Sequence, residues 1–215
     1  MENPIINIIT RTSNRPNGFE RTVNSIKNQT YKNVNHIVCT DDLNSIEYII
    51  QCGIENYHII DRDELIKNDN NVDPKTGPYS PHNLYFNVIH EHITDGWVIY
   101  LDDDDIFVNN LVLEKLVKLI NDSDENHIIF WRMVYSNGMY LPLTIDKSNP
   151  PKIGQIGGSC FTFHHKYIKY ANWDSWKCGD FRVIDRLYKI IPNYIWYPEK
   201  LIYVSKQGFG LRKDI

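Results

Sequence analysis

Short apolar runs alternate with amphipathic stretches along most of the chain. Runs rich in β-branched residues predict strands, whereas apolar residues three and four positions apart predict helices. Strands are expected at 4–10, 34–40, 56–61, 96–101 and 127–136. Helices are expected at 19–29, 45–53, 82–93 and 111–122. This alternation predicts a single α/β domain over residues 1–215, with a mostly parallel, Rossmann-like sheet and helices on both faces.

Turn-rich segments interrupt this pattern. Residues 69–81 are dense in Asp, Asn, Pro and Gly and predict a long loop. Asn137-Gly138 follows the strand at 127–136 and is typical of a hairpin. From Asn149 onward glycines mix with aromatics, and the clear pattern there is a helix around 181–189.

Composition limits the classes of partner and the cellular compartment that we expect for this protein. A chain of 215 residues that is 42% hydrophobic can build one sizeable core. Its 23 basic and 27 acidic residues give a net charge of -4, so no broad basic field attracts nucleic acid or an anionic membrane. Four cysteines without a CxxC pair favour a reducing compartment. With no signal-peptide pattern and no membrane-length apolar run, we expect a cytoplasmic protein.

The segment WVIYLDDDDIF, residues 97–107, places four consecutive carboxylates behind a buried strand. Adjacent carboxylates repel one another, and each costs several kcal/mol to bury unless a positive group answers it. The cluster Asp102 to Asp105 therefore predicts a bound cation. In open α/β sheets, ligands bind beyond the carboxyl ends of the strands. Asp42, which closes the strand at 34–40, is expected to face the same crevice.

Three segments resemble landmarks of the family 2 glycosyltransferases of the GT-A fold. These are IINIITRTSNRPNGFERTVNSIKNQTYKNVNHIVCTDD near the start, GWVIYLDDDD, and WKCGDFRVIDRL at 176–187. The first two resemble the family in combination and in order, and the third is a partial match. The resemblance covers roughly residues 4–190. It implies inverting transfer of a sugar from a nucleotide-diphosphate donor, with Mn²⁺ or Mg²⁺ neutralising the leaving diphosphate.

The resemblance also implies a donor-binding part, about 1–105. By motif position Asp104 is the direct metal ligand, and Asp102 contacts the ribose or reaches the metal through water. Strand alternation is expected to turn Asp103 and Asp105 away from the metal. Asp42 occupies the position that accepts from N3–H of uracil, which favours UDP. The nucleotide-binding residues implied in this way are Arg11, Thr12, Asp42, Asn83, Asp102 and Asp103.

One of these residues departs from the family pattern. Arg11 stands where the family has proline or threonine, and two roles are open for it besides bordering the base. It reaches a phosphate, or it is a surface arginine. Asn83 matches a family position close to the ribose, and its alternative role is a helix cap.

The remaining part, about 106–215, is expected to bind the acceptor. Asp180 occupies the family position of the general base, with a helix N-cap as the alternative. Gly157 and Gly158 fit a segment near the sugar, or a plain tight turn. Trp173 and Trp176 fit sugar stacking or core packing. A glycan, a glycoprotein or a small glycoside all suit such a site.

Other interpretations start from the same residues. A phosphatase or a nucleotidyltransferase also holds Mg²⁺ with carboxylates, and a GT-A-like protein can bind nucleotide without transferring sugar. A calcium-binding module lacks support because the EF-hand glycine and glutamate are missing. His164 and His165 are adjacent, so in a strand at most one of them reaches a shared metal. The tail at 205–215 is a candidate lid over the diphosphate, or a disordered terminus.

Overall fold

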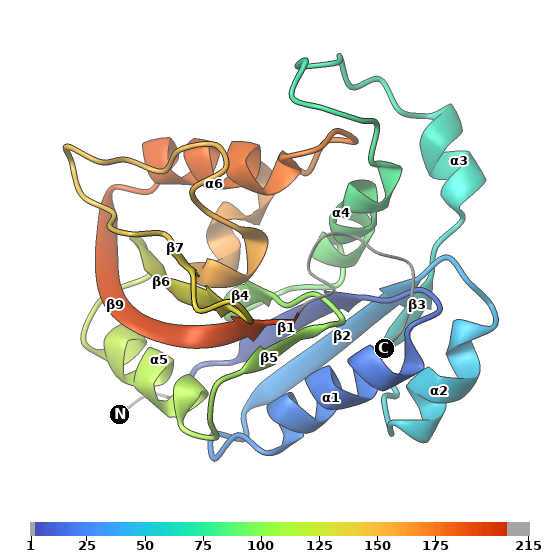
Figure 1. The fold of residues 1–215 in the computed structure, drawn as a ribbon, viewed down its shortest axis with the longest axis horizontal. Helices are drawn as coiled ribbons and strands as arrows, with labels where there is room; N and C mark the ends of the chain where they lie inside the picture. Colours follow the sequence, from blue (N-terminus) through green and yellow to red (C-terminus); the bar gives the residue numbers. More distant parts are fainter. Residues whose placement is uncertain (1–2, 206–215) are drawn as a thin grey trace.

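One mixed sheet organises the protein. The computed structural model describes residues 3–205. Within them the strand order is β3-β2-β1-β4-β8-β6-β9-β5, and β7 pairs with β6 at the side (Figure 1). The predicted α/β class with helices on both sheet faces is confirmed.

The first half of the chain supplies the parallel part of the sheet. It contains β1 (Ile6–Arg11), β2 (Val34–Thr40), β3 (Tyr57–Ile59) and β4 (Trp97–Tyr100). The pairs β1–β2, β1–β4 and β2–β3 all run parallel. All four residues of β4 are buried, as its continuous apolar run predicts. These four strands lie within three residues of their expected bounds.

Helices cover both faces of these strands (Figure 1). On one face lie α1 (Pro16–Lys27) and α2 (Ser45–Gln51), whose Phe19 and Ile49 pack on Val38 of β2. On the other face lie α4 (Tyr85–His90), entered through the 3₁₀ turn η1 (Pro81–Leu84), and α6 (Gly179–Ile190). The short helix α3 (Arg62–Lys67) was not predicted. It buries none of its residues, so it lacks an apolar stripe, and it begins where the Asp61 side chain accepts from Glu64 N–H.

The second half adds the antiparallel strands. It contains β5 (Asp105–Phe107), α5 (Val112–Asn121), β6 (His127–Tyr135), β7 (Tyr140–Leu141), β8 (Phe161–His164) and β9 (Asn193–Val204), with 3₁₀ turns η2 (Gly158–Cys160) and η3 (His165–Tyr170). Strand β8 runs antiparallel between β4 and β6. The curved β9 pairs in parallel with β6, and its end pairs antiparallel with β5.

Sequence patterns predicted part of this half. The helix at 111–122, the strand at 127–136 and the hairpin at Asn137-Gly138 are confirmed by α5, β6 and the β6–β7 pair. The strands β5, β8 and β9 were not predicted. These strands supply the antiparallel pairs β4–β8, β6–β8 and β5–β9.

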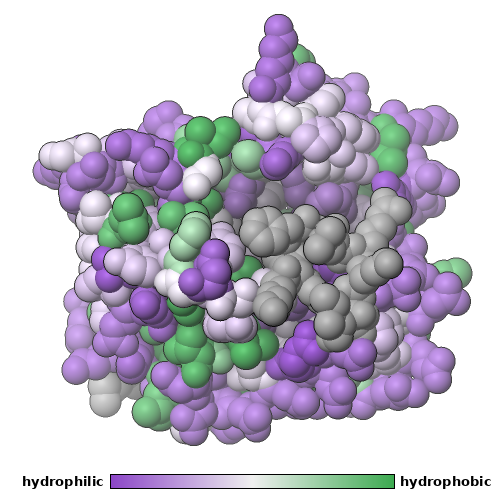
Figure 2. Space-filling view, viewed as in Figure 1, coloured by the Kyte–Doolittle hydropathy of each residue, from purple (hydrophilic) through white to green (hydrophobic). Residues whose placement is uncertain are grey.

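A large aromatic core lies between the layers. Fully buried side chains include Tyr100, Phe130, Trp131, Phe161 and Phe163. The face of the molecule seen in Figure 2 is largely hydrophilic, with hydrophobic residues gathered mainly over the side of the second half of the chain. No helix among residues 3–205 is long and apolar enough to cross a bilayer.

Candidate active site

The carboxyl ends of β1, β2 and β4 meet at one edge of the sheet because these strands run parallel. The residues that follow them are Arg11 and Thr12, Asp41 and Asp42, and the carboxylate cluster Asp102 to Asp105. The ends of β1 and β4 are in direct contact, because Arg11 Nε donates to Asp102 Oδ1 at 3.1 Å.

The carboxylate cluster lies on a turn. Strand β4 ends at Tyr100, and Asp105 N–H donates to the Asp102 carbonyl at 3.0 Å. Strand alternation therefore does not decide where these side chains point, contrary to expectation. Asp102 leaves 43% of its side chain exposed. Asp103, Asp104 and Asp105 are all buried.

Arginines and hydroxyls compensate the buried carboxylates. Arg15 Nη1 lies 3.0 Å from Asp103 Oδ1 and 3.4 Å from Asp104 Oδ2. Thr12 Oγ1 donates to Asp103 Oδ2 at 2.9 Å. Ser159 donates to Asp105 at 2.6 Å. Asp104 Oδ2 is buried and accepts no hydrogen bond from residues 3–205.

The cluster holds its negative charge at a cost. Burial raises the pKa of Asp103 to about 7, although Arg15 acts in the opposite direction. Burial and then the charge of Asp102 raise the pKa of Asp104. A divalent cation stabilises ionised carboxylates against both effects. Asp104, whose buried Oδ2 accepts no hydrogen bond from the described residues, and the accessible Asp102 therefore fit a cation site.

Asp180 lies in the first turn of α6. The N-cap position belongs to Cys178, which has a left-handed backbone with φ of 64°, so Asp180 is not the N-cap. Its Oδ1 accepts from Phe181 N–H at 2.8 Å. Burial raises the pKa of Asp180, and the charge of Asp102 raises it further. The Asp180 side chain is half-buried, and it lies close enough to the carboxylate cluster for the charge of Asp102 to affect its pKa.

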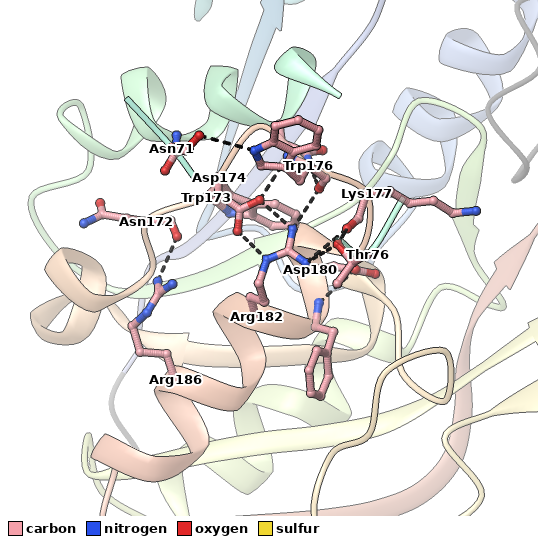
Figure 3. A network of polar contacts seen from close by, with 12 residues as sticks. Asn71, Thr76, Asn172, Trp173, Asp174, Trp176, Lys177, Asp180, Arg182 and Arg186 are labelled. Atoms are coloured by element: carbon pink, nitrogen blue, oxygen red, sulfur yellow. Dashed lines mark hydrogen bonds and ion pairs between the residues drawn. The ribbon is translucent and has the colours of Figure 1, made fainter. Parts of the chain in front are cut away.

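A polar network fixes the segment that leads into α6 (Figure 3). Arg182 forms two hydrogen bonds with the Asp174 carboxylate. The same guanidinium donates to the Trp176 carbonyl at 3.0 Å and to Thr76 Oγ1 at 2.8 Å. Thr76 belongs to the long loop 69–81, so Arg182 ties that loop and residues 174–176 to α6.

Asn83 connects this network to the donor-side residues. Its Oδ1 accepts from Arg11 at 2.9 Å, and its Nδ2 donates to the Trp176 carbonyl at 2.9 Å. It also packs on Gly179, where an added Cβ would lie 2.8 Å from Asn83 Nδ2. Both ends of the amide are engaged inside the protein. A contact between Asn83 and a ribose would use the second lone pair of Oδ1 or the second N–H of Nδ2.

The glycine segment lies beside Asp180. A Cβ on Gly157 would come within 2.4 Å of Met133 Cε, so only glycine fits there without a shift. A Cβ on Gly158 would lie 3.7 Å from Asp180 Cβ. Gly158 therefore borders the candidate base.

The two candidate stacking residues have different environments. Trp173 is 4% exposed and packs on Phe86 and Tyr100, with ring centroids 4.6 and 5.0 Å away. Its ring is a core element, so sugar stacking does not describe it. Trp176 is half-buried against Tyr79, with ring centroids 5.2 Å apart. Of the two, Trp176 has the surface that a ligand requires.

Asp42 lies at the start of α2. Its carboxylate accepts from Asn44 N–H at 3.0 Å and from Ser45 Oγ at 3.2 Å. The preceding Asp41, which sequence reasoning did not select, accepts from Tyr85 OH at 2.8 Å. Both carboxylates border the same strand end.

Sequence reasoning also missed Arg15 and the Arg182–Asp174 pair. A signal for Arg15 exists, because four clustered carboxylates need a nearby cation and SNRPNG supplies one after β1. Asp174 and Arg182 are eight positions apart across a helix start, and no local pattern marks that pairing. On α6, Lys189 Nζ donates to Asp185 Oδ2 at 2.6 Å, so Asp185 is paired within its own helix.

Two surface cavities lie elsewhere. They measure about 210 and 420 Å³ and follow the amino ends of β1 and β2, lined by residues such as Asn7, Val34 and His36. Neither contains the carboxylates, so the chemistry of the strand ends, and not cavity size, identifies the site.

Comparison with solved structures identifies the fold. The chain resembles S. aureus TarS 1-349, with a TM-score of 0.69 and 16% identity over 94% of this chain and 61% of that one. The same protein has been crystallised in complex with UDP-GlcNAc. The chain also resembles the mannosyltransferase PcManGT from Pyrobaculum calidifontis in complex with GDP-Man and Mn²⁺, with a TM-score of 0.64, 14% identity, and 94% and 56% of the two chains covered.

These neighbours are longer than this chain and share little sequence identity with it. The chain spans about three-fifths or less of the length of these neighbours. No family model matches its sequence, and no curated protein matches it. The neighbours are GT-A-type glycosyltransferases, and at this identity the likeness concerns architecture. The chain has the GT-A fold of these glycosyltransferases.

Proposed function

We propose that this protein is a metal-dependent, inverting glycosyltransferase that uses a nucleotide-diphosphate sugar, with UDP as the nucleotide. The observation that carries the proposal is the carboxylate cluster at the end of β4 in a GT-A fold, with the Asp180 carboxylate within its electrostatic range. Residues up to about 105 bind the donor in this proposal, and residues from about 106 bind the acceptor.

Asp104 and Asp102 are the proposed holders of Mn²⁺ or Mg²⁺. When bound, the cation supplies positive charge to the diphosphate leaving group. Arg11, which contacts Asp102, would be a second positive group beside the cation. A phosphate oxygen competes with Asp102 for the Arg11 guanidinium, which suits the phosphate role among those open from the sequence.

The uracil preference rests on Asp42. A carboxylate accepts from the N3–H of uracil, whereas adenine has no donor at that position. Thr12 and Arg11 line the neighbouring strand end. Among structural neighbours, one has been crystallised with UDP-GlcNAc and another with GDP-Man and Mn²⁺, which supports a nucleotide-sugar donor.

Asp180 is the proposed general base. It accepts the proton of the acceptor hydroxyl as that oxygen attacks the anomeric carbon from the face opposite the diphosphate, so the configuration inverts. The raised pKa that burial gives Asp180 increases its proton affinity. The acceptor lies between Gly158 and Trp176 in this proposal, and it is a glycan, a glycoprotein or a small glycoside.

Thermal shift with a nucleotide panel tests the donor assignment. UDP, GDP and ADP are each added with Mn²⁺, with Mg²⁺ or with EDTA. A nucleotide at 100 times its Kd adds about 2.7 kcal/mol, which raises the melting temperature by roughly 5–10 °C for a chain of this size. We expect UDP with Mn²⁺ or Mg²⁺ to give the largest shift, and EDTA to abolish it.

Asp104→Ala should lose the metal-dependent UDP shift and keep its fold, because removing one buried charge relieves repulsion. Asp122→Ala is the matched control, an exposed carboxylate after α5. A full UDP shift in Asp104→Ala would contradict the metal assignment. Release of UDP from a UDP-sugar then distinguishes a working transferase from a protein that only binds nucleotide.

A further inference from the structure

We propose that Asp95, His164 and His165 form a second metal site, for a transition-metal ion of the Zn²⁺ type. It lies at the edge of the sheet opposite the carboxylate cluster. Strand β8 runs antiparallel to β4 and pairs His164 with Trp97, so the end of β8 meets the start of β4. Asp95 stands two residues before Trp97. The topology thus brings the three side chains together from two distant segments.

The adjacent histidines both reach this point, which corrects the expectation from strand alternation. Strand β8 ends at His164, and His165 begins the 3₁₀ turn η3. The backbone changes direction between them, and their ring centroids lie 4.6 Å apart. Two imidazoles therefore face one carboxylate.

The donor atoms are nearly at ligand spacing. His164 Nε2 lies 3.8 Å from Asp95 Oδ1, and His165 Nδ1 lies 3.7 Å from the same oxygen. All three donor atoms lie within 4.8 Å of one another. Around a tetrahedral ion with bonds of about 2.0–2.1 Å, neighbouring donor atoms are separated by roughly 3.3 Å. A small contraction of these side chains produces that arrangement.

A further carboxylate, Glu125, lies beside His164. Its Oε1 lies 3.5 Å from His164 Nε2, while its other oxygen pairs with Lys166 Nζ at 3.2 Å. Glu125 precedes β6, so it adds a third segment to the site. Two imidazoles with carboxylates are a donor set that suits Zn²⁺, whereas an all-oxygen set suits Mg²⁺ or Mn²⁺.

Each histidine has a ring nitrogen placed to coordinate an ion. His165 Nδ1 is buried and has no hydrogen-bond partner among residues 3–205. The His164 side chain is 7% exposed, and its Nε2 points to the two carboxylates. Asp95 is 67% exposed, so an ion enters from solvent.

Binding requires one local change. A metal on His164 Nε2 places the ring proton on Nδ1, which now accepts from Lys166 N–H at 3.5 Å. A contact of this length is weak, and its loss is local to the start of η3. The bond from Gly96 N–H to Asp95 Oδ1 is compatible with coordination, since a carboxylate oxygen has two lone pairs.

The bound ion ties the start of β4 to β8 and to the segment before β6. Its role in this proposal is structural. Strand β4 carries the carboxylate cluster at its other end, so fixing its start steadies the scaffold of the donor site without contacting the donor. The site is independent of the proposed function.

Zn²⁺ titration of the metal-stripped full chain by calorimetry tests the proposal. We expect one Zn²⁺ per chain and a rise in melting temperature. His165→Ala and Asp95→Asn should each weaken binding by at least the 10- to 100-fold typical of disturbing a metal site. Circular dichroism confirms that each variant is folded. Asp63→Asn should bind Zn²⁺ as the wild type does, because Asp63 is an exposed carboxylate of α3 outside both proposed metal sites.

Co²⁺ absorption identifies the ligands, since the four cysteines are free thiols. Visible bands of a tetrahedral ion without a thiolate charge-transfer band support histidine and carboxylate ligands. A thiolate band, unchanged Zn²⁺ affinity in both His165→Ala and Asp95→Asn, or no Zn²⁺ binding by the wild type overturns the site.

Discussion

Single aspartates at the candidate site differ in what compensates their burial. Asp103 has Arg15 and Thr12, and Asp105 has Ser159. Asp180 accepts from the amide of Phe181 in its own helix, and burial raises its pKa. A carboxylate held by one local amide keeps an oxygen for a proton, whereas Asp103 has both oxygens engaged. This contrast supports the proposed role of Asp180 as the base and of its neighbours as supporting residues.

Asp180→Asn should retain donor binding and lose transfer. The amide keeps the shape but cannot accept the acceptor proton, so the transfer rate should fall by about 10² to 10⁴. The rate with a working acceptor is measured beside the UDP-induced thermal shift of the same variant. Asp185→Asn on the same helix is the control, because Asp185 is paired with Lys189. Near-normal turnover in Asp180→Asn would remove this residue from the mechanism.

Asp42→Ala should weaken UDP binding more than ADP binding. Loss of a hydrogen bond to a charged group costs on the order of 1.5 to 3 kcal/mol, and adenine lacks the ring N–H that uracil offers at this position. Because Asp42 also accepts bonds at the start of α2, a general loss of stability is expected in addition. Asp61→Ala removes a comparable cap from α3 and serves as the control. Equal losses for UDP and ADP would assign Asp42 to the fold alone.

At the level of elements, local pattern predicted the parallel strands because β1 and β4 are runs of buried residues and β2 is buried over its last four residues. Strand β5 has three residues and begins inside the acidic cluster, so its charge hid it. Strand β9 contains Pro198 and exposed charged residues in its middle, and it has a register shift opposite Arg132. Its pairing depends on β6 and β5, which lie far away in sequence. Such strands are defined by partners, and single-sequence periodicity does not report partners.

The same distinction applies to the site. The residues at strand ends were predictable, since strand ends are local features. The network of Asn83, Arg182 and Asp174 was not, because it joins segments about 90 residues apart in the chain, as the bond from Asn83 to Trp176 illustrates. The position of Asp180 depends on that network.

Arg182→Lys should impair transfer while sparing donor binding. Lysine keeps the charge but cannot reproduce the bidentate contact with Asp174 together with the bonds to Trp176 and Thr76. The start of α6 should then shift, and a misplacement of about 1 Å costs up to 10²-fold in rate. Transfer rate and UDP affinity are measured together.

Arg186→Lys is the matched control for this prediction, because Arg186 is on the same helix and binds the carbonyls of Tyr170 and Asn172. Equal losses of transfer in the two variants would indicate a general effect on α6, and not positioning of Asp180 by Arg182.

For the whole molecule, buried histidines shape the response to acid. Burial lowers the pKa of His90 to about 4, and it is hydrogen-bonded to Tyr100. A histidine with a depressed pKa in the folded state contributes stability that is present above its unfolded pKa of about 6.5 and is lost as the pH falls towards 4. His82, with a pKa lowered to about 4 by burial, acts in the same direction. Asp103 acts in the opposite direction, because its raised pKa favours the folded state at low pH.

His90→Gln should therefore flatten the loss of stability between pH 6.5 and 4, by an amount on the order of 3 kcal/mol at most. Glutamine retains hydrogen-bonding capacity towards Tyr100 and does not titrate. Urea unfolding at several pH values measures the slope. His92→Gln, at an exposed position two residues on, is the control. A slope that equals that of the wild type would show that His90 titrates normally.

The curved strand β9 determines which part of the sheet is completed last during folding. Asp105 of β5 pairs with Val204, almost a hundred residues further along the chain. During synthesis the parallel strands can assemble early. Strand β5, which follows the turn that carries the carboxylates, cannot pair with β9 until β9 has been synthesised. We predict that nascent chains cut before β9 form the β1–β4 core yet leave residues 102–107 open to proteolysis. Protection of that segment in such chains would refute this order.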